Sequence, residues 1–409
     1  MMGKMQYMTA EEAAARLGIS RETLYAYVSR GLIRSRPAAD GSRRSQYLAT
    51  DIEAHRLRRE QQRNPAVVAE SVLDWGVPVL ESAISLIEDG RLYYRGHDVV
   101  DLALEATFEE VAGLIWTGDL DRSVFDHGLP RLPTRWDGGD ILGPIERFQY
   151  LLLLAAAEDP LAYDLRRNSV ISSGARMIQL MARAFCGRPD ADAGSTVGVL
   201  QEGWGLHPET QALLNAALIL CADHELNVSA FSARCIASAE ATPYAVVQGG
   251  LAALQGIKHG GSTARVEALL GEVGRAQDAP AVLAARLRRG ESLSGFRHPL
   301  YPDGDPRGRV LLRMLESFYP PSSGRDLALG VAATAKELYA VEPNIDFALV
   351  AMTLTLDLPP GSALGLFALG RTAGWMGHAL EQYATGSLIR PRARYMGPRP
   401  RKVLRESQS

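Results

Sequence analysis

A helical stripe near the C-terminus places an arginine among apolar side chains. A helix is predicted over residues 363–383, and its apolar face carries Phe367, Arg371, Trp375 and His378. A guanidinium in such a stripe needs an anion, because an unpaired buried charge is strongly unfavourable. The anion is either a carboxylate of this chain or a substrate carboxylate, which the planar guanidinium binds through two parallel hydrogen bonds.

Three histidines lie where an imidazole could act on a ligand. His224 ends the apolar stripe of a helix predicted over residues 209–224, which directs its side chain inward. His259 is flanked by glycines, which allow close approach of the backbone to a ligand. His298 lies in a loop rich in turn residues. Each histidine also has a structural explanation, as a satisfied core residue or as part of a surface turn.

A candidate general base begins another helix. Asn344 is expected to cap a helix over residues 346–356, which places Asp346 in the first turn. The positive end of the helix dipole keeps such a carboxylate ionised. Asp346 either supports the helix start or serves as a base beside an apolar helix.

The elements that position these residues are predicted to be almost entirely helical. Periodicity predicts the remaining helices over residues 108–117, 141–157, 172–185, 244–255, 279–287, 310–318 and 324–339. Strand signals are few, with a hairpin-like stretch over residues 91–95 as the exception. The sequence holds no P-loop and no convincing Gly-x-Gly-x-x-Gly motif, so a nucleotide-phosphate fold is not supported. The predicted fold class is all-α.

Composition places the chain among globular proteins. It has 409 residues, of which 46% are apolar and 22% charged. The three cysteines have no paired spacing, which excludes a disulfide framework or a cysteine zinc site and suggests a reducing compartment. The start of the chain lacks the apolar core of a signal peptide, and no apolar run is long enough to span a bilayer. We therefore expect a cytoplasmic protein without a membrane partner.

The charge distribution divides the chain. Residues 1–63 hold twelve basic and seven acidic residues, a net charge of +5 in a chain whose overall net charge is −3. A basic head on an acidic body suggests two modules with different partners. We place the boundary at Asn64-Pro65, which gives modules 1–63 and 66–409.

The first module has the pattern of a helix-turn-helix with a wing. Thr9 and Glu12 match a capping box for a short helix, and a second helix is predicted over residues 20–30. A polar stretch with an Asp-Gly turn signal follows, and then a charged helix over residues 51–63.

The fragment TAEEAAARLGISRETLYAYVSRGLIRSRP resembles MerR-like and excisionase-like DNA-binding modules. This resemblance implies that the second helix enters the major groove and that the wing meets phosphates. The implied DNA contacts are Arg21, Tyr25, Arg30, Arg43 and Arg44. The alternative is a small helical cap whose arginines are only solvated. A single module binds weakly, so DNA binding requires a dimer.

Seven segments of the second module resemble the citrate synthase family, in the family's order, over residues 86–398. They are LIEDGRLYYRGHDVVDLALEATFEEVAGLIWTGDL, DHELNVSAFSAR, PYAVVQGGLAALQGIKHGG, GFRHPLYPDGDPRG, VEPNIDF, GRTAGWMGHALEQ and LIRPRARYMG. The family condenses an acyl-CoA with a 2-oxo acid, normally acetyl-CoA with oxaloacetate. The resemblance implies acetyl-CoA as a co-substrate, no permanently bound cofactor and no metal.

The same resemblance implies a role for each site residue. Asp346 would remove a methyl proton from acetyl-CoA, His259 would stabilise the enol at the thioester oxygen, and His298 would donate to the ketone oxygen of oxaloacetate. The implied oxaloacetate-binding residues are His224, Arg307, Arg371 and Arg390. Arg390 would reach the site of the neighbouring subunit, which implies a homodimer. A small domain over residues 262–341, inserted in a large helical domain, would close over the substrates.

Two segments depart from the family's pattern. Arg297 and Pro299 stand where the family usually has glycine and arginine around the loop histidine, and Ser262 and Thr263 replace its usual Ala-Asn. Both segments touch CoA or the cleft in the family, so they bear on the choice of acyl group. The leading hypothesis is a citrate synthase. The alternatives are a 2-methylcitrate synthase that uses propionyl-CoA, a DNA-binding regulator with the synthase body as metabolite sensor, and a first module that serves only for protein interaction or oligomerisation.

Overall fold

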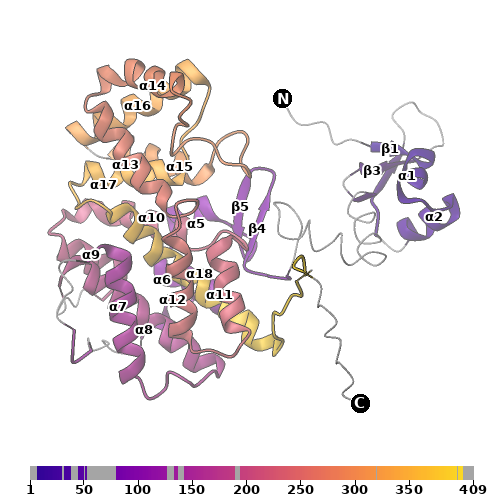
Figure 1. Cartoon of the computed structure of the whole chain (residues 1–409), viewed down its shortest axis with the longest axis horizontal. Helices are drawn as coiled ribbons and strands as arrows, with labels where there is room; N and C mark the ends of the chain where they lie inside the picture. Colours follow the sequence, from indigo (N-terminus) through magenta and orange to yellow (C-terminus); the bar gives the residue numbers. More distant parts are fainter. Residues whose placement is uncertain are drawn as a thin grey trace, which may run out of the picture. The chain divides into compact units, whose positions relative to one another are not determined.

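The structure is a computed structural model that describes residues 7–29, 32–37, 45–49, 51–52, 80–126, 133–136, 142–188, 194–318, 320–393 and 395–398. The chain forms two compact units, Met1–Glu81 and Ser82–Ser409, which are considered separately (Figure 1). None of the helices in the described ranges is long and apolar enough to cross a membrane.

The first unit is built on two short helices and a small sheet. Strand β1 (Tyr7–Thr9) leads into α1 (Ala10–Leu17), and the predicted capping box between Thr9 and Glu12 is confirmed. Gly18 ends α1 in the left-handed conformation, with φ at 59°, which glycine adopts without steric cost. Helix α2 (Arg21–Ser29) follows after a tight turn.

The wing strands pair as the helix-turn-helix pattern predicts. Strands β2 (Ser35–Pro37) and β3 (Ser45–Leu48) are antiparallel, and β3 also pairs with β1, so the strand order is β1-β3-β2. The core of this unit contains Ala13, Ala14, Leu17, Leu24, Ile33, Tyr47 and Ile52. The predicted Asp-Gly turn, the Asn64-Pro65 boundary and most of the predicted helix over residues 51–63 lie outside the described residues.

The second unit opens with a three-stranded antiparallel sheet, which confirms the predicted hairpin. Its strands are β4 (Ser85–Glu88), β5 (Arg91–Tyr94) and β6 (His97–Asp98). Tyr94 is fully buried, and its hydroxyl lies 2.9 Å from the carbonyl oxygen of Asp223. The sheet thereby contacts the segment that carries His224.

Helices make up the rest of this unit, as the all-α prediction requires. The first group is α5 (Val99–Glu105), α6 (Phe108–Thr117), α7 (Pro144–Glu158), α8 (Arg167–Cys186), α9 (Thr196–Gly203), α10 (Gln211–Cys221), α11 (Val228–Ala237) and α12 (Pro243–Leu254). The second group is α13 (Gly261–Val273), α14 (Ala279–Arg288), α15 (Pro306–Phe318), α16 (Ser323–Tyr339), α17 (Ile345–Thr355) and α18 (Ser362–Thr385). Three short 3₁₀ turns are η1 (Arg122–Phe125), η2 (Pro208–Thr210) and η3 (Ala276–Asp278).

Helices α13 to α16 gather at one end of the second unit, with α17 beside them (Figure 1). This group corresponds to the small domain predicted over residues 262–341. Because Ser82–Ser409 is one compact unit, the division at those residues stays a prediction.

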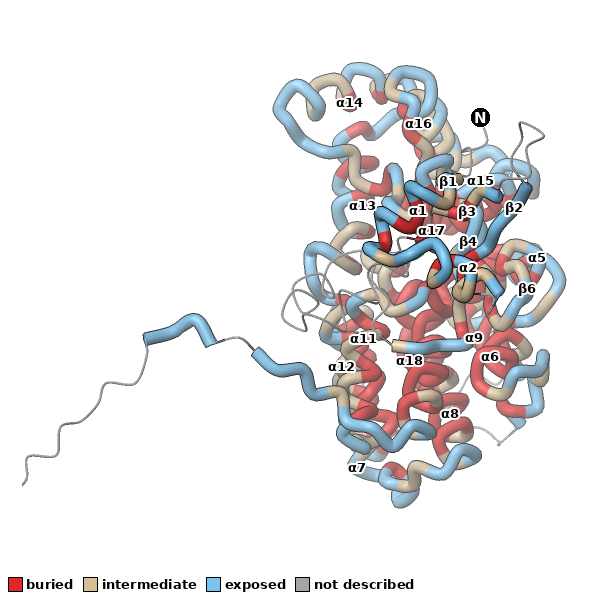
Figure 2. The backbone as a smooth tube through the Cα atoms, turned by 90° about the vertical axis from the view of Figure 1, so that its right-hand side faces the viewer, coloured by how far each residue is buried: buried red, intermediate tan, exposed pale blue. Residues whose placement is uncertain are grey.

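Helix α18 runs through the core of the second unit. Nearly all of its residues are buried (Figure 2), and it packs against α6, α8, α10, α11 and α12. Glycines make this close packing feasible. A Cβ at Gly370 would lie 2.5 Å from the carbonyl oxygen of Leu218, and a Cβ at Gly374 would lie 2.3 Å from that of Ala222.

The prediction that His224 belongs to a helix is wrong. Helix α10 ends at Cys221, because tertiary partners take the next backbone groups. Ala222 O accepts a hydrogen bond from Gly374 N at 3.0 Å, and Asp223 N donates to the Tyr94 hydroxyl at 3.0 Å. His224 therefore lies in the loop that follows α10.

We predict that Gly374→Ala destabilises the protein strongly. The new methyl group would overlap the backbone of Ala222 and the carboxylate of Asp223, neither of which is a flexible side-chain end. Overpacking of this kind costs about 1–3 kcal/mol or more.

The matched control is Gly271→Ala in α13, where nothing lies within 4 Å of the new Cβ. That change should raise the unfolding free energy by about 0.5–1 kcal/mol. Urea unfolding measures both, and equal stability of the two variants would contradict the close packing.

Candidate active site

The loop that carries His298 is hydrogen-bonded to the segment that leads into α17. Arg297 N donates to Glu342 O at 2.9 Å, and Asn344 N donates to Gly295 O at 2.8 Å. The Asn344 side chain also donates to Arg297 O at 3.2 Å. Two predicted catalytic residues, His298 and Asp346, are thus carried by segments fixed to each other.

Asp346 occupies the predicted position in the first turn of α17. The side chain of Asn344 caps the helix by accepting hydrogen bonds from the backbone N–H groups of Asp346 and Phe347. Burial raises the pKa of Asp346 to about 6, although a hydrogen bond from Ser262 and the positive charge of Arg307 act in the opposite direction. A carboxylate with a pKa in this range suits a general base near neutral pH.

A hydrogen bond within its own loop determines which ring nitrogen of His298 carries the proton. Leu300 N donates to His298 Nδ1 at 3.2 Å, so the neutral imidazole carries its proton on Nε2. Burial, together with the charge of Arg307, lowers the pKa of His298 to about 4. His298 is therefore a neutral hydrogen-bond donor at neutral pH.

His259 receives its orientation from α11 and α18. Its Nε2 lies 2.9 Å from Ser229 Oγ, which also accepts from Trp375 Nε1 at 3.2 Å and lies 2.7 Å from Asn227 Oδ1. Burial lowers the pKa of His259 to about 4. The Ser229 hydroxyl donates to Asn227 Oδ1, so His259 Nε2 donates to Ser229 Oγ in this arrangement. Donation from His259 Nδ1 requires the hydroxyl proton of Ser229 to turn from Asn227 to His259.

His224 is buried in contact with two further aromatic side chains of the site. Its ring lies 5.2 Å from that of His298 in an edge-to-face arrangement, and its Nε2 lies 2.9 Å from the hydroxyl of Tyr301. Burial and the charges of Arg307 and Arg371 hold the pKa of His224 well below its ordinary value. His224 is therefore uncharged.

The two predicted carboxylate-binding arginines differ in their partners. Arg307 is buried and paired with Asp305, with its Nε 3.0 Å from Oδ1 and its Nη2 2.8 Å from Oδ2. Arg371 is also buried, and its Nε donates to Cys221 O at 2.7 Å. Within the described ranges no carboxylate forms an ion pair with Arg371, and the charge of Asp223 acts on it at longer range.

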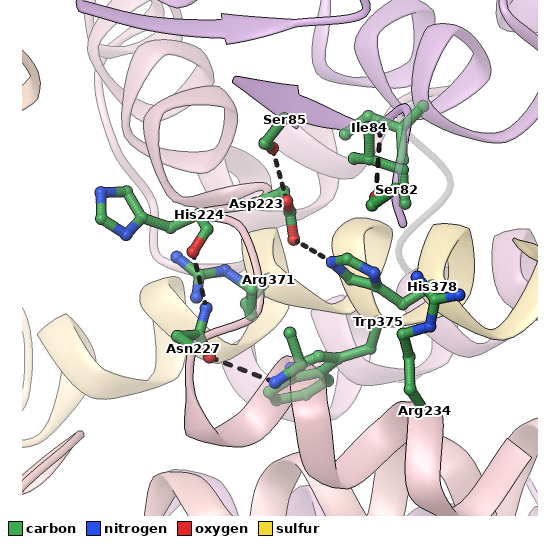
Figure 3. Close-up of polar contacts among 12 residues, drawn as sticks. Ser82, Ile84, Ser85, Asp223, His224, Asn227, Arg234, Arg371, Trp375 and His378 are labelled. Carbon is green, nitrogen blue, oxygen red and sulfur yellow. Dashed lines mark hydrogen bonds and ion pairs between the residues drawn. The ribbon is translucent and has the colours of Figure 1, made fainter. Parts of the chain in front are cut away.

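Ser85, Asp223 and His378 form a polar cluster near Arg371 (Figure 3). Asp223 accepts hydrogen bonds from Ser85 and from His378 Nε2, the latter at 3.1 Å. The neighbouring side chains of Asp223 and His224 point in different directions, so that Asp223 faces His378 and His224 faces away from it (Figure 3). The predicted apolar face of α18 is confirmed, because Phe367, Arg371, Trp375 and His378 are all buried.

The remaining predicted contact residues are Arg390 and five residues of the first unit. Arg390 is exposed and follows the end of α18. In the first unit, Tyr25 is 51% exposed, and Arg21 forms a surface ion pair with Glu11 at 3.2 Å. Arg30, Arg43 and Arg44 fall outside the described residues.

Three residues that support the site were not predicted from the sequence. They are Ser229, Tyr301 and Asp305, which contact His259, His224 and Arg307. Asp305 had a local signal, since it lies two residues before Arg307 in the Asp-Pro-Arg sequence at the start of α15. The contacts of Ser229 and Tyr301 join residues 30 and 77 positions apart, and no local pattern encodes them.

We predict that the neutral histidines make the protein sensitive to acid. The pKa of His298 is about 4 in the folded state, against about 6.5 when unfolded. Stability is therefore lost as the pH falls from 6.5 towards 4, because only the unfolded state takes up the proton. His298→Gln should remove at most about 3 kcal/mol of that loss.

Urea unfolding at pH 7 and pH 4.5 measures this difference. His207→Gln is the control, because the side chain of His207 is 72% exposed. A variant at His298 whose acid sensitivity equals that of the wild type would show that this imidazole is not held neutral by burial.

Comparison with known proteins shows the family to which the chain belongs. The family model described as "Citrate synthase, C-terminal domain" matches residues 72–127 and 142–392, and the model "Helix-turn-helix domain" matches residues 7–59. "Putative citrate synthase 2" of Mycobacterium tuberculosis is 34% identical over 338 residues, which cover 77% of this chain and 89% of that protein.

Two further likenesses agree. The 2-methylcitrate synthase of the same organism is 30% identical over 359 residues, which cover 79% of this chain and 89% of that protein. The crystal structure of citrate synthase from Thermotoga maritima superimposes with a TM-score of 0.66 at 28% identity and covers 80% of this chain and 96% of that one. The chain therefore belongs to the citrate synthase family of acyltransferases.

Proposed function

We propose that this protein condenses acetyl-CoA with oxaloacetate and water to give citrate and CoA. The observation that carries the proposal is the pairing of the two catalytic segments. The His298 loop and the start of α17 share backbone hydrogen bonds, so the segment that carries a base whose pKa is about 6 is fixed to the segment that carries a neutral imidazole donor.

The first step is enolisation of the thioester. Asp346 takes a proton from the methyl carbon of acetyl-CoA, while His259 donates a hydrogen bond to the thioester oxygen. A thioester methyl proton is a very weak acid, so its removal requires stabilisation of the developing oxyanion at the same moment. An oxyanion donor of this kind contributes about 2–4 kcal/mol to transition-state stabilisation.

The second step forms the carbon–carbon bond. The enol carbon attacks the ketone carbon of oxaloacetate, and His298 donates from Nε2 to the ketone oxygen as it becomes a hydroxyl. His224, Arg307 and Arg371 hold the two carboxylates, which fixes the ketone for attack. Water then cleaves the thioester of citryl-CoA and releases citrate and CoA.

The site is completed by a second copy of the chain in this proposal. Arg390 is exposed beyond α18, where a charged side chain can extend to a neighbouring subunit. Arg307 is already neutralised by Asp305, so a substrate with two carboxylates gains from one further cation. We propose a homodimer in which Arg390 of each chain enters the site of the other.

The acyl group is proposed to be acetyl, with propionyl as the alternative. A relative named 2-methylcitrate synthase matches the chain at 30% identity, which supports the alternative. One additional methylene changes the preference of a pocket by only about 1–3 kcal/mol. A comparison of acetyl-CoA and propionyl-CoA as substrates decides between the two.

We predict that the purified chain releases free thiol from acetyl-CoA only when oxaloacetate is present. Asp346→Asn should lower kcat by at least about 100-fold, since the amide cannot take up the proton. In the wild type, kcat/KM should fall as the pH drops below about 6, because protonated Asp346 is inactive as a base.

The control for this assay is Asp357→Asn, at a residue that lies beyond the end of α17. Folded wild-type protein that releases no thiol with either acyl-CoA would refute the proposed reaction. Activity in Asp346→Asn equal to that of the wild type would refute the role of the base alone.

We propose a second function, DNA binding, for the first unit. The helix-turn-helix match supports it, and α2 presents Arg21, Tyr25 and Ser29 on an exposed face at helical spacing. The ion pair between Arg21 and Glu11 is exposed, and such pairs contribute at most about 1 kcal/mol. A DNA phosphate can therefore replace Glu11 as the partner of Arg21.

We predict that the full chain shifts a DNA fragment taken from upstream of its own gene at low salt. Arg21→Ala should weaken binding and reduce the slope of log affinity against log salt by about 1. The control is Lys336→Ala, which removes a surface cation of the second unit.

Oxaloacetate or acetyl-CoA in the binding buffer should change the affinity if the synthase body acts as a metabolite sensor. Absence of any shift at low salt would reject DNA binding and leave the first unit as a protein-interaction module.

A further inference from the structure

Tyr301 lies at the centre of the groups proposed to hold the 2-oxo acid. Its hydroxyl is 2.9 Å from His224 Nε2, its ring centroid is 5.0 Å from that of His298, and the guanidinium of Arg307 lies 5.5 Å from its ring centre. The side chain is 1% exposed. None of the catalytic steps described above uses Tyr301.

The hydrogen bond between Tyr301 and His224 has a defined direction. Both groups are neutral, because burial raises the pKa of Tyr301 and lowers that of His224. In the described part of the chain, His224 Nε2 is the hydrogen-bond partner of the Tyr301 hydroxyl. If the imidazole were the donor, the buried phenol proton would lack an acceptor among the described residues, which is unfavourable. The phenol O–H therefore donates to Nε2.

This direction fixes the proton of His224 on Nδ1. A neutral imidazole carries one proton, so an Nε2 that accepts from Tyr301 leaves Nδ1 as the donor. The opposite tautomer would present a lone pair to the substrate, which repels an anionic carboxylate oxygen.

We propose that Tyr301 is a positioning residue for the 2-oxo dicarboxylate, which sets the tautomer of His224 through its hydroxyl and supports the ring of His298. This inference rests on the proposed function, since it names how the same site recognises its anionic substrate. Tyr301 acts through His224 and need not touch the substrate.

Tyr301→Phe tests the role, because it removes the hydroxyl and keeps the ring. We expect the dissociation constant of oxaloacetate, measured by calorimetry on the full chain, to rise about tenfold. The KM for acetyl-CoA should stay within about twofold of the wild type, since the polar and ring contacts of the Tyr301 side chain with described residues are with groups proposed to act on oxaloacetate.

The matched control is Tyr244→Phe, which removes another buried phenol, one that donates to Asp159 at 2.8 Å in a different part of the unit. It should leave oxaloacetate binding unchanged.

A second readout reports the tautomer directly. In protein labelled with ¹⁵N on histidine, the wild type should show His224 protonated on Nδ1, and Tyr301→Phe should shift the population towards Nε2. A merely structural role of Tyr301 would not move this signal. His224→Gln identifies the resonance by its loss.

The outcomes separate the two proposals. Wild type that binds oxaloacetate, with Tyr301→Phe binding it equally well and an unchanged tautomer, would overturn the role of Tyr301 and leave the reaction intact. Wild type that fails to bind oxaloacetate would overturn the proposed reaction and this role together.

Discussion

The site depends on the close contact between α18 and the segment that leaves α10. Gly370 and Gly374 present no side chain of their own at this contact, so the backbone of α18 can approach the carbonyl oxygens of Leu218 and Ala222. Arg371 Nε then reaches Cys221 O, and Gly374 N reaches Ala222 O. His224 follows two residues later, so a single packing contact positions two groups proposed to hold the same substrate. Asp223 and His378, which are both fully buried, form a pair next to this contact (Figure 3).

Burial then decides which groups carry charge. Three imidazoles, those of His224, His259 and His298, are uncharged because they are buried and because guanidinium groups lie near them. Asp305 offsets the charge of Arg307, whereas Arg371 forms no ion pair with a carboxylate of the described residues and is influenced by the charge of Asp223 at longer range. The same desolvation raises the pKa of Asp346, so one physical cause prepares both the neutral donors and the base. The arrangement suits the proposed enol chemistry of an anionic substrate, since it combines two buried guanidinium groups with neutral imidazoles.

Local sequence patterns predicted the features that neighbouring residues determine, namely helix bounds and helix caps. The bounds of α6 agree with its periodicity, and the Asn344 cap placed Asp346 in the first turn of α17. Periodicity did not predict α11 or α13, because Ser, Cys and Gly interrupt the apolar pattern of these segments. The end of α10 was misplaced because the reason for it, the hydroxyl of Tyr94, comes from a strand more than one hundred residues earlier. The site residues came from a resemblance to a family, and their supporting contacts required the structure.

The most direct measurement is a crystal structure of the full chain with oxaloacetate and a nonreactive acetyl-CoA analogue. The proposed mechanism places the Asp346 carboxylate about 3 Å from the carbon that replaces the methyl group, with His259 Nδ1 on the thioester oxygen and His298 Nε2 on the ketone oxygen. Ligands bound elsewhere, or an Asp346 carboxylate turned away from both histidines, would contradict the mechanism.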